Sequence, residues 1–144
     1  MAAVDDLDKL IEQYDKALDE FVKGNPEPIK ELFSHREYVT LSNPFFPVGH
    51  GWEQVAERLE GASSNFRDGE LTSIEPVEKY VTPELAYEVR VERAKTKVGG
   101  SEELSPIAVR ATTIFRPEDG EWKVVHRHGD PITTPQPAQS ILQE

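Results

Sequence analysis

The chain has 144 residues, a length typical of a single domain that buries its hydrophobic core without metals or crosslinks. Its 27 Asp and Glu residues outnumber 16 Lys and Arg residues, and the formal net charge of −11 argues against binding to the phosphate backbone of nucleic acids. The absence of cysteine excludes disulfides and thiol chemistry, and no apolar run is long enough to span a membrane.

The N-terminal segment, MAAVDDLDKL, has neither the basic start nor the apolar stretch of a signal peptide, so we expect a cytoplasmic protein. Apolar residues then recur at helical spacing and predict a helix over residues 7–22, which Gly24 and Pro26 end. A second, short helix is expected over residues 26–33.

The next segment is less regular. A short strand is expected over residues 37–41 and a loop over 42–51, followed by a helix whose apolar side runs from Val55 to Phe66. Trp52 stands at the start of this helix. Together with the Phe45-Phe46 pair of the loop, it forms an apolar lip over a cavity mouth or only seals the loop.

The second half of the chain is rich in strands. They are predicted at residues 71–81, 85–97, 104–116 and 121–128, with turns at 82–83, 99–100 and 118–120. Helices followed by such a meander predict an α+β fold, a cone-shaped curved antiparallel sheet wrapped around the N-terminal helices and enclosing a pocket. Residues 1–131 form this single domain, and the proline-rich residues 132–144 form an extended tail.

The final strand carries the candidate site. Alternation places Trp122, Val124, His126 and His128 on one face, and Glu121, Lys123, Val125 and Arg127 on the other. Because three of the last four residues are charged, we expect that second face to meet solvent. The two histidines are therefore predicted to face the pocket.

The turn before this strand sets the register of its neighbour. The segment PEDGE suits a three-residue loop with a left-handed glycine, which places Arg110 opposite His128 and facing inward. A one-residue slip would turn Arg110 outward. The opposite face is then apolar, and from it we expect a homodimer through the outer face of the sheet; its residues are Ile107, Val109, Ala111, Thr113 and Phe115.

His126, His128 and Asp130 leave three interpretations open. Two imidazoles and a carboxylate suit zinc, but no later histidine completes the set, so we expect no metal and no cofactor. The second interpretation is proton transfer next to a carbonyl, with His126 or Asp130 as the base, and with Arg110 and His128 orienting an anionic or carbonyl group. In the third, the histidines only hydrogen-bond to the backbone.

Three further residues are candidates for contact with a ligand. Tyr14 lies on the apolar face of the first helix, where its hydroxyl reaches the cavity or its ring only packs in the core. Trp122 is expected to line the apolar part of the pocket. Glu92 alternates with apolar residues that predict it to face solvent, unless a bulge reverses its strand.

The C-terminal half resembles a known family. The chain is similar, from Leu7 to Pro131, to the SnoaL-like branch of the nuclear transport factor two-like superfamily, and Glu92-Arg93 matches a recurrent pair of that branch. The most specific matches are Arg110, Thr112, Arg116, Gly120, Trp122, His126, Arg127, His128 and Asp130. The resemblance implies a cone-shaped α+β barrel with a cavity, and usually a dimer packed through the sheet.

The resemblance does not imply one activity, because relatives include ketosteroid isomerases, polyketide cyclases, dehydratases, epoxide hydrolases and non-catalytic assembly domains. The tyrosine and two aspartates of the ketosteroid isomerases are not matched, apart from a partial match at Tyr14. We therefore predict a protein with a pocket for an unknown small molecule, acting as an isomerase, cyclase or lyase by proton transfer. The alternative is a non-catalytic ligand-binding or assembly module.

Overall fold

The computed structural model describes residues 4–143. Its three helices are α1 (Val4–Phe21), α2 (Glu27–Leu32) and α3 (Trp52–Ser63). Its six strands are β1 (Thr40–Ser42), β2 (Gly49–His50), β3 (Phe66–Val81), β4 (Ala86–Val98), β5 (Leu104–Glu118) and β6 (Glu121–Asp130). None of the helices in this part of the chain is long and apolar enough to cross a membrane.

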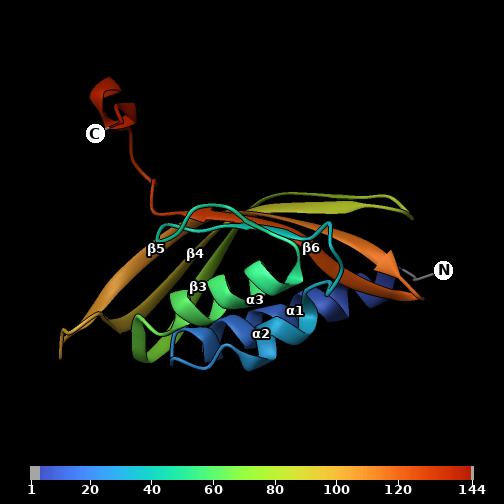
Figure 1. Ribbon diagram of the computed structural model, residues 1–144, viewed down its shortest axis with the longest axis horizontal. Coiled ribbons are helices and arrows are strands. Elements are labelled where there is room, and N and C mark those ends of the chain that lie inside the picture. The colour runs from blue at the N-terminus through green and yellow to red at the C-terminus, as the bar shows by residue number, and fades with distance from the viewer. Residues whose placement is uncertain (1–3, 144) are drawn as a thin grey trace.

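The strands form one curved sheet in the order β2-β1-β6-β5-β4-β3. All neighbours are antiparallel except β1 and β6, which are parallel. The three helices lie against one face of this sheet and leave the other face uncovered (Figure 1). The predicted α+β fold, a curved sheet around the N-terminal helices, is confirmed.

Helix α1 packs on the sheet through one apolar stripe. Leu7, Leu10, Tyr14 and Leu18 are buried, at the three- and four-residue spacing that places side chains on one side of a helix. They share the hydrophobic core with Val55 and Leu59 of α3 and with apolar residues of the sheet, namely Ala86, Phe115, Trp122 and Val124. This stripe holds the helices above the sheet and so defines the space between them.

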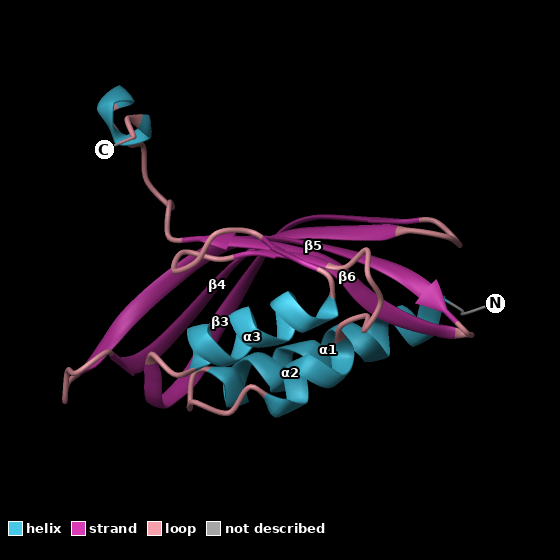
Figure 2. Ribbon diagram, in the orientation of Figure 1, coloured by secondary structure: helices cyan, strands magenta, loops and turns pink. Residues whose placement is uncertain are grey.

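Several element boundaries differ from those predicted. Helix α3 ends at Ser63, and Phe66 begins the long strand β3 rather than closing the helix. The predicted loop over residues 42–51 contains the short strand β2. The tail after Asp130 leaves the body, as Figure 2 shows, and includes a 3-10 helix at Ala138–Ile141.

The hairpin between β5 and β6 has a shorter loop than predicted. Asp119 and Gly120 have positive φ values of 52° and 85°, and Glu118 pairs directly with Glu121. This is a two-residue Asp-Gly turn, whose twist matches that of the strands. The register slips by one residue, so Arg110 faces outward. The residues predicted to form the outer face of β5 face the helices instead.

A β-bulge reverses the second part of β6. Phe115 pairs with Val124 and Ile114 pairs with His126, so that Val125 is an extra residue without a partner in the ladder. Before the bulge, Trp122 and Val124 face the core as predicted. Beyond it the faces are exchanged, and Arg127 instead of a histidine faces inward. The prediction that His126 and His128 point into the cavity is wrong for this reason.

Strand β4 also presents the face opposite to the one predicted. Its even-numbered residues face the helices, and Arg90 and Glu92 are only 3% and 6% exposed. Ala86, Ala94 and Thr96 are buried on the same face. The expected outward direction of these charges is wrong because buried ion pairs satisfy them, and no bulge within β4 is needed. Val89 and Val91 lie on the outer face.

Candidate functional site

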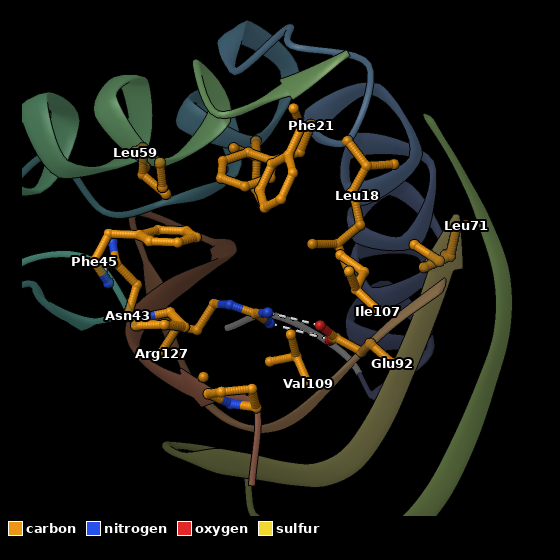
Figure 3. Close-up of a pocket in the computed structure, with 18 of the residues that line it drawn as sticks. Leu18, Phe21, Asn43, Phe45, Leu59, Leu71, Glu92, Ile107, Val109 and Arg127 are labelled. Carbon is orange, nitrogen blue, oxygen red and sulfur yellow. Dashed lines mark hydrogen bonds and ion pairs between the residues drawn. The ribbon is translucent and has the colours of Figure 1, made fainter. Parts of the chain in front are cut away.

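A cavity of about 220 Å³ lies between the helices and the inner face of the sheet. Leu18, Phe21, Phe45 and Leu59 lie around its apolar side, as Figure 3 shows. Glu92 and Arg127 lie next to each other on the opposite side and are the only ionisable side chains among the described residues that line it. The cavity is therefore an apolar space with one ion pair in its wall.

The ion pair joins two strands that are not neighbours in the sheet, β4 and β6. Arg127 Nη2 lies 2.6 Å from Glu92 Oε1, and Arg127 Nη1 lies 3.0 Å from Glu92 Oε2. Such a bidentate geometry fixes both the position and the orientation of a guanidinium group. Because the Val125 bulge turns Arg127 inward, a single extra residue in β6 assembles this pair.

Other buried polar groups extend the pair away from the cavity. Arg127 Nη1 donates to Tyr14 Oη at 3.1 Å, and Arg90 Nε donates to Glu92 Oε2 at 2.9 Å. Arg90 in turn forms ion pairs with Asp15 of α1 at 2.7 Å and with Glu88 at 3.3 Å. A continuous set of charges thus connects helix α1 to the cavity wall.

The charges of the lining pair are fixed by their surroundings. Burial disfavours ionisation of Glu92, but Arg127 and Arg90 outweigh it and hold the pKa of the Glu92 carboxyl below its ordinary value. Burial also opposes the charge of Arg127, yet Glu92 overcomes it and raises the pKa of the guanidinium. At neutral pH the cavity wall therefore carries one anion and one cation, firmly paired.

The outer members of the set behave differently. Burial raises the pKa of Asp15 and that of Glu88, although Arg90 acts in the opposite direction on both. Burial likewise raises the pKa of the Tyr14 hydroxyl, which therefore stays protonated. Tyr14 is 2% exposed and contacts Arg127 rather than the cavity, so its hydroxyl helps to position the guanidinium.

The predicted histidine cluster does assemble, but on the outer face of the sheet. Asp130 lies 2.7 Å from Arg110 Nε and 3.3 Å from His128 Nε2. The side chains of Arg110 and His128 are both 55% exposed. His126 Nδ1 is hydrogen-bonded to Thr40 Oγ1 at 2.7 Å. Three of the predicted residues, Arg110, His128 and Asp130, therefore lie together, but on the opposite side of the sheet from the one expected.

The ionisation of this outer cluster follows from the same forces. Burial, with a contribution from the nearby charge of His128, lowers the pKa of His126. Partial burial acts against ionisation of Asp130, but Arg110 and the backbone N–H of Ile132 hold the pKa of this carboxyl below its ordinary value. The roles predicted for His126, Asp130, Arg110 and His128 in chemistry stay predictions.

The two tryptophans do not line the cavity. Trp122 is 3% exposed and belongs to the hydrophobic core. Trp52 stacks on the ring of His35, with 3.8 Å between the ring centroids. The loop residue Phe45 does line the cavity. This position agrees with the first of the two alternatives for the Phe45-Phe46 pair, an apolar lip over the cavity mouth.

Metal binding has little support in the geometry of either cluster. Within residues 4–143, no group of three or more His, Cys, Asp or Glu side chains is arranged to hold a metal ion. Both oxygens of Glu92 accept hydrogen bonds from arginine, and those of Asp130 face Arg110 and His128. Both carboxylates are therefore engaged by other side chains of the protein.

Arg127 is the residue of the cavity wall that the sequence does not reveal, because strict alternation through the whole strand predicts a solvated face for it. The Asp119-Gly120 pair, a strong signature of a two-residue hairpin turn, indicates the register of β5 and the outward direction of Arg110, but not the direction of Arg127. The Val125 bulge has no comparable signature, because neither a glycine nor a proline marks it.

Comparison with known proteins identifies relatives by family and by fold. A family model described as a SnoaL-like domain matches residues 14–133. No curated protein matches this chain.

Solved structures with the same fold cover nearly the whole chain. A nuclear transport factor 2 (NTF2-like) superfamily protein from Salmonella enterica serovar Typhimurium LT2 has a TM-score of 0.74 and 17% identity, covering 91% of this chain and 92% of that one. A proposed dehydratase of the NTF2-like family from Streptomyces avermitilis has a TM-score of 0.72 and 20% identity, and the match covers 91% of this chain and 96% of that one. A ketosteroid isomerase-like protein from Erwinia carotovora atroseptica SCRI1043 has a TM-score of 0.70 and 15% identity, and the match covers 88% of this chain and 94% of that one. Identities this low establish a shared fold and no shared activity.

Proposed function

The chain belongs to the SnoaL-like domain family, and from this premise we propose that it binds a small, mainly apolar molecule in the cavity between its helices and its sheet. The single observation that supports this proposal is the composition of the cavity wall, which is apolar except for Asn43 and the Glu92–Arg127 pair. Ligand sites in proteins combine such an apolar lining with a few polar groups that orient the ligand.

The burial of charge at the cavity strengthens the proposal. Taking Glu92 and Arg127 out of water costs several kcal/mol of free energy per ion, and their mutual attraction, together with Arg90, has to offset that cost. A cavity wall made entirely of hydrocarbon side chains would avoid that cost. We infer that the pair is retained because it orients a ligand.

Binding fits the geometry better than proton transfer does. A base that acts next to a carbonyl needs a pKa near the working pH, whereas two guanidinium groups hold the pKa of Glu92 below its ordinary value. The predicted bases His126 and Asp130 face away from the cavity. An isomerase, cyclase or lyase reaction at these residues would need a substrate on the outer face of the sheet.

The decisive experiment fills the cavity without touching its charges. Ala94 lines the cavity and is 5% exposed, so we expect Ala94→Phe to occupy the space and abolish binding of small aromatic compounds detected by NMR titration. Lys95→Phe is the matched control, because Lys95 belongs to the same strand, is exposed and faces the other side. Binding that survives Ala94→Phe would contradict the proposal, provided that the variant remains folded.

We retain the homodimer as a proposal, now on different residues. The outer faces of β4 and β5 carry the partly buried Tyr87, Val89, Val91 and Ile114, none of which a helix covers. A second copy packed on this face would remove them from water. Light scattering at micromolar concentration should report a dimer, and Val89→Asp should convert it into a monomer.

A cytoplasmic location likewise stays a prediction of the N-terminal sequence.

A further inference from the structure

We propose that the ligand of this cavity is an uncharged molecule of about nine non-hydrogen atoms, with a carbonyl or similar acceptor oxygen directed at Arg127. This inference rests on the proposed binding function and specifies its ligand class. Three independent properties of the cavity carry it: the charge of its wall, the direction of its free hydrogen bonds, and its volume.

The charge of the wall selects against ions. Arg127 is already neutralised by the bidentate contact with Glu92, at 2.6 and 3.0 Å. A ligand carboxylate next to Arg127 would lie within a few ångströms of the Glu92 carboxylate, in a site where only 6% of the Glu92 side chain meets solvent. Like charges in such a place repel strongly, and a second anion would have no counterion.

A cationic ligand meets the converse difficulty. Both oxygens of Glu92 are engaged, Oε1 by Arg127 and Oε2 by Arg127 and Arg90. Two guanidinium groups therefore stand where a ligand ammonium group would have to bind. A neutral ligand leaves the charge balance of the wall unchanged, so only an uncharged molecule avoids an uncompensated buried charge.

The free hydrogen-bonding capacity of the wall is that of a donor. A guanidinium group has five N–H donors. Arg127 uses Nη1 for Tyr14 and Glu92, and one hydrogen of Nη2 for Glu92. Nε–H and the second hydrogen of Nη2 have no acceptor among the residues that the structure describes. A ligand in the cavity can supply an acceptor for them, and a carbonyl oxygen does so without a charge.

The volume limits the size of the molecule. A dry protein cavity of about 150 Å³ holds benzene, which has six non-hydrogen atoms. In proportion, the volume of about 220 Å³ found here holds about nine. This is one ring with a short substituent. A skeleton of four fused rings does not fit unless the cavity widens.

Three compounds with nine non-hydrogen atoms each test the class directly on the unmodified protein. Cumene, acetophenone and benzoate share a phenyl ring and differ only in the substituent, which is apolar, neutral with a carbonyl, or anionic. Dissociation constants are measured by NMR titration at neutral pH. We expect acetophenone to bind at least roughly tenfold more tightly than either of the other two compounds. Cumene lacks the hydrogen bond to a charged donor, and benzoate is repelled by the Glu92 carboxylate.

Removing the negative charge from the cavity wall should let the cavity accept an anionic ligand. Glu92→Gln removes the anion next to Arg127 and keeps the shape of the side chain. We expect benzoate to bind this variant at least roughly tenfold more tightly than it binds the unmodified protein, because Arg127 then lacks its counterion. Glu75→Gln is the matched control, since it makes the same change on β3 in a residue whose side chain is 59% exposed and paired with Arg93.

The outcomes separate this inference from the binding function itself. If benzoate binds the unmodified protein as tightly as acetophenone, the neutral class is wrong and the cavity remains a ligand site. If none of the three compounds binds at concentrations up to roughly 10 mM, the binding function fails and the inference fails with it. If Glu92→Gln does not fold, the comparison of acetophenone with benzoate on the unmodified protein still decides the question.

Discussion

Two of the ion pairs of strand β6 lie on opposite faces of the sheet, and the comparison between them is informative. Inside, Arg127 and Glu92 approach to 2.6 Å with side chains that are 12% and 6% exposed. Outside, Arg110 and Asp130 approach to 2.7 Å with side chains that are 55% and 18% exposed. The chemical groups and the distances are nearly the same, whereas the access of water differs several-fold.

The comparison shows that distance alone does not set the energy of an ion pair. The outer pair is screened by solvent, and such pairs contribute about 0–1 kcal/mol to stability. The inner pair was costly to bury, and breaking it would leave a charge without compensation. We therefore expect the two faces of one strand to respond very differently to the same substitution.

Replacing the arginine of each pair with leucine should show the largest difference. Arg127→Leu leaves Glu92 buried with only Arg90 as a partner. We expect the free energy of unfolding to fall by about 3 kcal/mol, the lower end of the range for breaking a buried pair. Arg110→Leu should lower it by less than about 1 kcal/mol.

Urea denaturation of the two variants, followed by circular dichroism at a fixed protein concentration, measures both values. The fixed concentration removes any contribution from self-association. Equal losses of stability in the two variants would show that burial does not distinguish the pairs.

Much of the fold follows from the sequence. The apolar spacing from Leu7 to Leu18 predicts α1, and the Thr-Pro, Gly-Gly and Asp-Gly turns divide the four long strands correctly. These signals are local, because helical periodicity and turn residues act over a few positions. The pairing of β1 with β6 was not predicted, since nothing local links residues more than 80 positions apart.

The site was less predictable, because it depends on which face each strand presents. One residue of slip at the Asp119-Gly120 turn reverses β5, and one extra residue at Val125 reverses the end of β6. In β4, burial of the charges Arg90 and Glu92 contradicts the usual rule that charged faces meet water. That rule fails where charges pair with one another, and the pairing partners become visible only in three dimensions.

A smaller effect is expected from crowding the inner pair. Gly129 lies under the guanidinium group, and a Cβ atom there would lie 3.4 Å from Arg127 Nη2 and 3.0 Å from Val109 Cγ1. Only Val109 must shift slightly, since 3.4 Å is an ordinary contact, so Gly129→Ala should lower the free energy of unfolding by about 1 kcal/mol. It should also weaken acetophenone binding, because Gly129 and Val109 line the cavity and the new methyl group occupies part of it next to Arg127. Unchanged affinity in an NMR titration would mean that the ligand does not reach this side of the cavity.

The outer face should respond to pH through His126. Burial and the charge of His128 lower the pKa of His126 in the folded protein. The unfolded chain then binds a proton more tightly, so this contribution to stability is complete above the unfolded pKa of about 6.5 and is lost as the pH falls through the folded value.

Because His126 is partly exposed, the loss should stay below about 1 kcal/mol. Replacing the imidazole in His126→Gln should flatten the dependence of unfolding free energy on pH between 7 and roughly 5. A slope that persists in His126→Gln would show that the effect does not come from this imidazole.

The smallest effect is expected at Asp130. Here a measurement of ligand affinity, rather than of stability, distinguishes the inner face of the sheet from the outer face. Asp130→Asn removes the charge that faces Arg110 and His128, and the solvent around both partners should limit the loss to below about 1 kcal/mol. Asp130 lies outside the cavity, so acetophenone should bind this variant with an affinity within about twofold of the original. A large loss of affinity in an NMR titration would mean that the outer cluster contacts the ligand. The predicted roles of His126 and Asp130 would then apply to a site on the outer face.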